Sequence, residues 1–73
     1  MNRNPHATLV TTVRMTRKAI KRRCHHAPWY YLRNYVRRVE TAILLAGNIR
    51  AGREEPSQAF MAIRDMDDIL LEC

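Results

Sequence analysis

The chain has 73 residues, 47% of them hydrophobic, and a formal net charge of +6. Its length allows one small domain, residues 1–73, and the apolar fraction favours a folded chain over a disordered one. The sequence lacks the run of about 18 apolar residues that a membrane span requires, and its N-terminus lacks the pattern of a secretory signal. We therefore expect a cytoplasmic protein with no membrane partner.

The charges divide the chain into a basic and an acidic part. Residues 1–53 contain 12 Lys or Arg and one acid, Glu40, whereas residues 54–73 contain one Arg and six acids. The two parts therefore carry net charges of +11 and −5. A basic surface of this density predicts an anionic partner, either nucleic acid or the acidic face of another protein.

A first helix is predicted from Ala7 to Cys24, after a flexible leader at residues 1–6. Apolar and small residues recur there in steps of three and four, which places them on one side of an α-helix. This buried stripe consists of Leu9, Val13, Thr16, Ile20 and Cys24, with Val10 at its edge. The Thr and Val residues near the start are mediocre helix formers, so an extended segment up to Thr12 is an open alternative.

The other side of this first helix is strongly basic. It carries Arg14, Arg17, Lys18, Lys21 and Arg22, with Arg23 near the rim. In composition the segment RMTRKAIKRR, residues 14–23, resembles an arginine-rich RNA-binding helix, whose cations neutralise phosphates. Contact with an acidic protein surface and a solvated face are the two alternatives.

A long central helix is predicted from Pro28 to Gly52, and it carries the clearest apolar pattern of the chain. Its predicted core seam consists of Trp29, Leu32, Val36, Val39, Ile43 and Ala46. Residues beside the seam widen the apolar stripe to about half of the circumference, more than the ~100° usual for a surface helix. They are Tyr31, Tyr35, Ala42 and Ile49. Such a helix must be covered on two sides, by the other helices or by a second copy in a homodimer.

Three residues of the central helix are candidates for contact with a partner. Arg33 and Arg37 lie opposite the seam, and their like charges four residues apart indicate an external anion or the chain's own acids. Trp29 and Tyr31 are expected in the core. Tyr30 points to the basic side, where it could stack on an unpaired base.

A third helix is predicted from Pro56 to Leu71, after a loop at about residues 47–55. Its buried stripe consists of Ala59, Ala62, Ile63, Met66, Ile69 and Leu70. The far side, which we interpret as a solvated acidic face, carries Asp65, Asp68 and Glu72. Phe60 and Leu71 lie off the stripe and form either an apolar patch for a partner or the edge of the core.

The residues that catalysis or a metal site would need do not occur in suitable patterns. Cys24 and Cys73 are the only two thiols, so we expect them to be reduced. Cys24, His25 and His26 are consecutive and point about 100° apart on a helix, so with His6 they do not converge on one metal ion. A Gly-rich phosphate loop, a nucleophile turn and a triad spacing are absent from the sequence. We therefore expect no enzymatic activity and no cofactor.

A resemblance to a known family covers the whole chain in length and charge pattern. The basic segment RMTRKAIKRR and the acidic segment RDMDDILLEC, residues 64–73, make the chain similar to the small phage-encoded proteins that bind bacterial RNA polymerase. The resemblance implies a protein that blocks promoter recognition, displaces the σ factor from promoter DNA and acts as an antiterminator. It also implies a partner surface near the β′ N-terminus and the β flap. It transfers no individual functional residue, because no motif maps the family onto this sequence.

The sequence therefore predicts a small all-α protein, a three-helix unit with a long central helix between a basic first helix and an acidic last helix. The predicted function is regulation of transcription by attachment to host RNA polymerase. Direct binding of RNA or DNA is the alternative. A base-reading helix-turn-helix is not predicted, because a proline and a charged loop occupy the place of its tight turn.

Overall fold

The computed structural model describes residues 4–24 and 27–73, and these ranges form three α-helices and one short 3-10 helix, with no strand. The helices are α1 (Pro5–Arg23), α2 (Trp29–Arg50) and α3 (Ala59–Glu72), with the 3-10 helix η1 at Pro56–Gln58 directly before α3. The prediction of a small all-α three-helix unit is confirmed.

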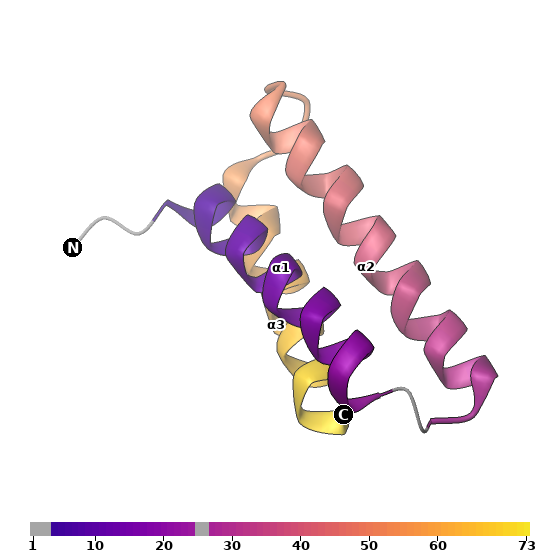
Figure 1. Cartoon of the computed structure of the whole chain (residues 1–73). Coiled ribbons are helices and arrows are strands. Elements are labelled where there is room, and N and C mark those ends of the chain that lie inside the picture. The colour runs from indigo at the N-terminus through magenta and orange to yellow at the C-terminus, as the bar shows by residue number, and fades with distance from the viewer. Residues whose placement is uncertain (1–3, 25–26) are drawn as a thin grey trace.

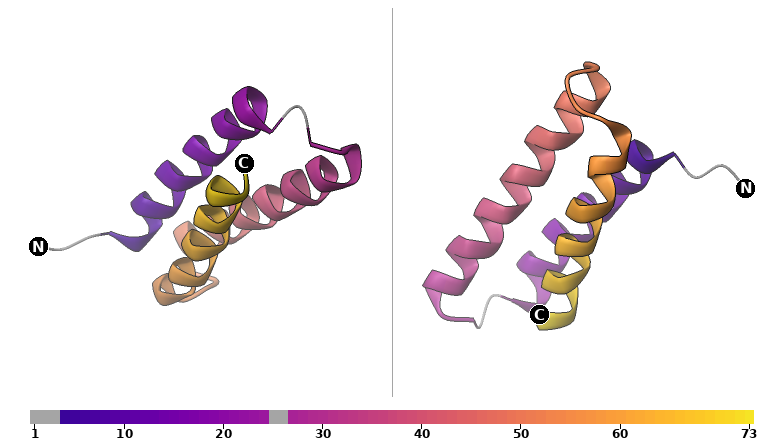
Figure 2. Two further views of the ribbon diagram at one scale, coloured as in Figure 1. Left: turned by 90° about the horizontal axis from the view of Figure 1, so that it is seen from below. Right: turned by 180° about the vertical axis from the view of Figure 1, so that it is seen from behind.

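The helices form an elongated, flat bundle. α2 runs antiparallel to α1, and α3 returns antiparallel to α2 and alongside α1 (Figure 1). Seen from the front and from behind, α2 diverges from α3 toward its first residues (Figures 1 and 2). The principal extents are 37 × 25 × 15 Å. None of the helices in the described residues is long and apolar enough to cross a membrane.

Helix α1 begins earlier than the sequence pattern predicts. Pro5 occupies the first turn, where its missing N–H is no loss, and the Asn4 side chain accepts hydrogen bonds from the amides of His6 and Ala7 at 3.0 and 3.4 Å. Residues 4–6 therefore belong to the start of the helix, and the prediction of a leader there is wrong; residues 1–3 lie outside the described residues. The extended alternative up to Thr12 is also wrong.

The core contains the predicted stripes of α1 and α3. Leu9, Met66 and Ile69 are fully buried, and so is Thr16. Burial of the Thr16 hydroxyl is tolerated because it donates to the Thr12 carbonyl at 2.8 Å, so no polar group is left unpaired. The remaining members of both stripes are buried or packed against this cluster, except Leu70, which is half-buried.

Helix α2 buries only part of the predicted seam, together with three of the residues predicted beside it. Its buried residues are Tyr35, Val39, Ala42, Ala46 and Ile49. Trp29, Val36 and Ile43, predicted in the seam, are 68%, 45% and 43% exposed, and Tyr31, also expected in the core, is 49% exposed. The seam prediction is therefore wrong for these four residues. The apolar stripe of α2 is wider than α1 and α3 can cover, and the two helices cover the half centred on Tyr35 and Ala42.

The connection from α2 to α3 is shorter than predicted. Gly47 is helical, α2 continues to Arg50, and the predicted loop at 47–55 reduces to residues 51–55. Gly52 has φ +77°, a left-handed conformation that other residues rarely adopt. The amide of Arg53 then donates to the Asn48 carbonyl at 2.8 Å, which satisfies one of the last carbonyls of the helix.

A disulfide joins Cys24, at the end of α1, to Cys73, at the end of α3. The two Cα atoms are 5.1 Å apart, a normal span for such a bond. The prediction of two reduced thiols is therefore wrong. α1 and α3 run alongside each other, so their C-terminal ends meet although 49 positions separate the cysteines in the sequence. His25 and His26, weighed as metal ligands, lie outside the described residues.

Candidate functional site

A groove with an apolar floor runs between α1 and α2. It consists of two adjoining hollows of about 330 and 200 Å³ that share Arg17 and Ile43. Helix α1 contributes Val10, Val13, Arg14, Arg17, Ile20 and Lys21. Helix α2 contributes Val36, Val39, Glu40, Ile43 and Ala46. We call this surface the α1–α2 groove.

The floor of the groove contains two apolar residues of α2 that the bundle leaves partly uncovered, beside others that it buries. Val39 is buried at the bottom, whereas Val36 and Ile43 lie on the flank and are nearly half exposed. On the α1 side, Ile20 is half-buried. These branched apolar side chains expose apolar surface to water, and burying it against another apolar surface would lower the free energy.

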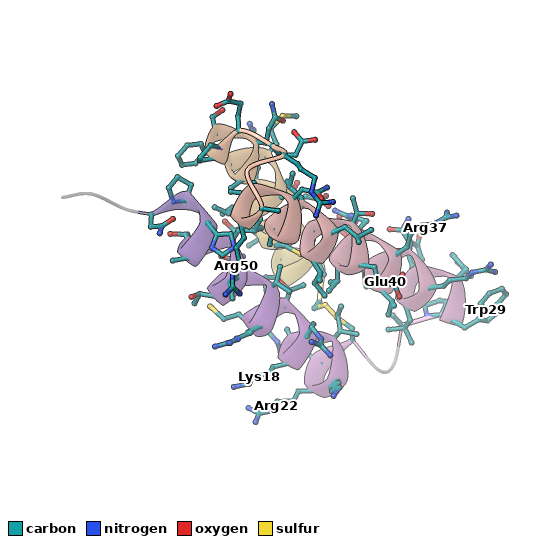
Figure 3. All side chains as sticks on the ribbon, turned by 90° about the horizontal axis from the view of Figure 1, so that it is seen from above. Lys18, Arg22, Trp29, Arg37, Glu40 and Arg50 are labelled. Carbon is teal, nitrogen blue, oxygen red and sulfur yellow. A yellow bond between two sulfur atoms is a disulfide. The ribbon has the colours of Figure 1, made fainter. Side chains whose placement is uncertain are left out.

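The edge of the groove formed by α1 is cationic. Arg14, Arg17 and Lys21 are exposed along it, and Glu40 on α2 is the one acid in the lining. In Figure 3, Glu40 lies on the side of α2 that faces α1. Within residues 4–24 and 27–73, the ion pairs shorter than 4.0 Å or at that limit involve Arg38 and none of the groove cations. The groove thus combines apolar contact with positive charge.

The seven cations predicted as one basic face belong to three surfaces. Arg14, Arg17 and Lys21 border the groove. In Figure 3, Lys18 and Arg22 point away from α2, and Arg37 points away from α1. Arg33 joins Arg37 on the outer side of α2, where both line a further hollow of about 410 Å³ that shares Val36 and Glu40 with the groove.

The flank of α2 that faces α3 is closed by an ion-pair network that the sequence interpretation missed. Arg38 donates to Asp65 Oδ1 from Nη2 at 2.5 Å and from Nε at 3.0 Å, and its Nη1 lies 4.0 Å from Glu72 Oε2. Its guanidinium also lies 6.0 Å above the Tyr35 ring. The solvated-face interpretation is therefore wrong for Asp65, whereas Glu72 is exposed and lies at the distance limit of an ion pair. A signal was present, because Arg38 follows the buried Tyr35 by three residues and lies on the same flank.

These contacts shift two pKa values. The hydrogen bonds from Arg38 to Asp65 raise the pKa of the guanidinium, in spite of the opposing effect of burial. Burial, followed by an interaction with the Glu72 carboxylate, raises the pKa of the Tyr35 hydroxyl. Both shifts favour the states that exist at neutral pH, a charged Arg38 and a neutral Tyr35.

An exposed aromatic cluster lies at the start of α2. Trp29 and Tyr30 are 6.5 Å apart in an edge arrangement, and the rings of Tyr30 and Tyr31 are 4.6 Å apart. The Arg33 guanidinium lies 6.0 Å from the Trp29 ring. Tyr30 is 56% exposed, as a stacking role requires, although its ring already contacts Tyr31.

Phe60 and Leu71 are 60% and 85% exposed, so the alternative that they close the edge of the core is wrong. They lie on the same side of α3, eleven positions and therefore about 16 Å apart along its axis. The charged residues Arg64 and Asp67 lie on that side between them. The two side chains are thus separate apolar points, not one patch.

Comparison with known proteins assigns no family to this chain, because no family model, no curated protein and no solved structure matches it. The side chains of the groove supply apolar surface and positive charge.

Proposed function

We propose that this chain is a binding protein that regulates transcription by attaching to bacterial RNA polymerase through the α1–α2 groove. In this proposal it acts in the host cytoplasm, blocks promoter recognition and serves as an antiterminator. The polymerase, and the region near its β′ N-terminus and β flap, are supplied by the resemblance in length and charge pattern. The groove supports the wider statement that the partner is a protein.

One observation carries the choice of a protein partner. Val36 and Ile43 are 45% and 43% exposed in a trough bordered by cations. Protein interfaces bury apolar side chains in a core and surround them with polar groups. A phosphate backbone contacts cations and offers no surface that would favour apolar branched side chains. The groove therefore has the composition of a protein-binding surface.

Direct nucleic-acid binding is the second candidate, and a different surface favours it. Lys18 and Arg22 project together from the outer side of α1 (Figure 3). Trp29 and Tyr30 are exposed beside Arg33 at the start of α2. Single-strand binders combine such cations with aromatic rings on which bases stack.

A pull-down from bacterial lysate separates the two candidates. The tagged full chain is incubated with lysate before and after nuclease treatment. Recovery from the treated lysate is compared at low salt and at ~0.3 M salt, where a contact carried by phosphates loses orders of magnitude in affinity. We expect RNA polymerase in both eluates. Nucleic acid recovered before nuclease treatment, with no polymerase after it, would contradict the proposal and favour the second candidate.

A charge-reversed variant adds an internal control to the pull-down. Replacing Lys18→Glu and Arg22→Glu changes the outer side of α1 and leaves the groove lining unchanged. We expect this variant to retain polymerase and to lose whatever nucleic acid the wild type retains at low salt. Circular dichroism checks that its helical content equals that of the wild type.

A further inference from the structure

The shape of the α1–α2 groove suits the packing of one more helix against α1 and α2. Its two walls are antiparallel helices, and its apolar side chains come from both of them. Val36 and Ile43 are seven positions apart and Ile20 faces them from α1, a spacing that matches the ridges of a packed helix. From Val10 to Lys21 the α1 wall is eleven positions long, which is about 16 Å or three turns.

The charge of the groove indicates the kind of helix that fits. Arg14, Arg17 and Lys21 line the α1 edge, and none of the lining residues that α1 contributes is an acid. A docking helix with Asp or Glu toward α1 would neutralise these cations. A second copy docked symmetrically by the same groove would instead bring the two cationic edges together. Charge complementarity therefore favours an acidic helix of another protein.

We infer that the α1–α2 groove accepts an acidic amphipathic helix of the partner protein. The helix would have apolar residues at i, i+4 and i+7 over Val36 and Ile43, and acids on the side toward Arg17 and Lys21. It would pack as a fourth helix on the bundle and cover the exposed half of the α2 stripe. This inference rests on the proposed protein-binding function and names the segment that the partner must present.

A peptide titration of the full chain tests the inference. The probe is a stapled helical peptide of about 14 residues, four turns, with Leu at i, i+4, i+7 and i+11 and Glu and Ala elsewhere. A second peptide carries Lys in place of every Glu, and a third has the same composition in scrambled order. Binding is measured by fluorescence anisotropy, and its location by chemical-shift changes in the labelled chain. We expect the acidic peptide to bind at the groove, and at least about tenfold more tightly than the other two.

Two pairs of variants locate the contact. Ile43→Asp places a charge in the groove, whereas Leu44→Asp makes the same kind of change at a neighbour that is 70% exposed and absent from the lining. Lys21→Glu reverses a charge in the lining of the 330 Å³ hollow, whereas Arg22→Glu reverses one that lines neither the groove nor the cationic hollow beside it. We expect Ile43→Asp and Lys21→Glu to weaken the acidic peptide at least about tenfold, and their controls to change it less than about twofold.

Several outcomes would overturn the inference. These are no binding of the acidic peptide, equal binding of the Lys peptide, equal effects of the paired variants, or shift changes outside the groove. Self-association that Ile43→Asp abolishes, seen by sedimentation, would make a second copy the occupant and overturn it too. If the pull-down recovers no polymerase while the acidic peptide binds as expected, the polymerase proposal fails and the groove inference stands.

Discussion

The two flanks of α2 differ in whether acids of α3 face the cations. On the flank toward α3, Arg38 pairs with Asp65 and approaches Glu72 over the buried ring of Tyr35. On the flank toward α1, Val36 and Ile43 remain exposed beside cations that have no acid from α3 near them. The charges on the first flank are paired within the chain, whereas the second flank leaves apolar side chains and cations available to a partner.

The placement of the acids explains this difference. Six of the seven acids follow residue 53, and four of those lie within α3. α3 packs against the flank with Arg38, so its carboxylates neutralise charge there. The cations on the α1 edge of the groove form no ion pair with these carboxylates in the part of the chain that the structure describes. The uneven charge of the sequence thus becomes an uneven charge across one helix.

The largest expected difference between core and groove concerns side-chain truncation. Met66 is fully buried, so Met66→Ala should lower the free energy of unfolding by about 2–5 kcal/mol. Ile43 is 43% exposed, so Ile43→Ala should lower it by less than about 1 kcal/mol. Urea denaturation followed by circular dichroism measures both. Equal losses would mean that the groove is closed in solution.

Removal of the disulfide should have the next largest effect, and it should spare the groove. The bond spans 49 positions, for which loop-closure entropy gives about 4 kcal/mol, and measured losses are commonly 2–4 kcal/mol. We expect the double variant Cys24→Ser, Cys73→Ser to lose about that much stability in urea denaturation. Reduction of the wild type should reproduce the loss. A stability unchanged by either treatment would contradict a bond between these cysteines in solution.

The smallest effect concerns the ion pair on the closed flank. A double-mutant cycle of Arg38→Ala and Asp65→Ala should give a coupling of about 1 kcal/mol or less, because both side chains are partly exposed, at 25% and 41%. The coupling should decrease with added salt. Arg37→Ala, which removes a cation on the outer side of α2, is the control and should show no coupling to Asp65. A coupling for Arg37 as large as that for Arg38 would mean that the two flanks do not differ.

Much of the fold follows from the sequence, because local patterns determine it. The apolar stripes through Leu9 and Met66 each match the buried face of their helix. A narrow stripe can be buried in only one rotation of the helix about its axis. The half-wide stripe of α2 does not define which half is buried, so Trp29 and Ile43 were placed wrongly in the core. Only the packing of α1 and α3 decides that question, and no single helix contains this information.

The site and the bonds that close the bundle were less predictable, because they join distant positions. Arg38 and Asp65 are 27 positions apart, and their pairing depends on which flank of α2 meets α3. Cys24 and Cys73 meet because α1 and α3 end at the same place. The basic residues were identified correctly as exposed. Their division into a groove edge and two outer surfaces depends on how each helix is rotated about its axis in the bundle, which the sequence pattern does not give.

The disulfide also gives the protein a ring with a tail. Residues 24–73 form the covalent ring, closed by the bond from Cys24 to Cys73, and α1 is the tail attached to it. Arg53 is exposed in the connection between α2 and α3, where trypsin could cut. A single cut there opens the ring without releasing α3, because Cys73 still holds it to Cys24. A nicked molecule would then migrate as one species without reductant and as two fragments with it.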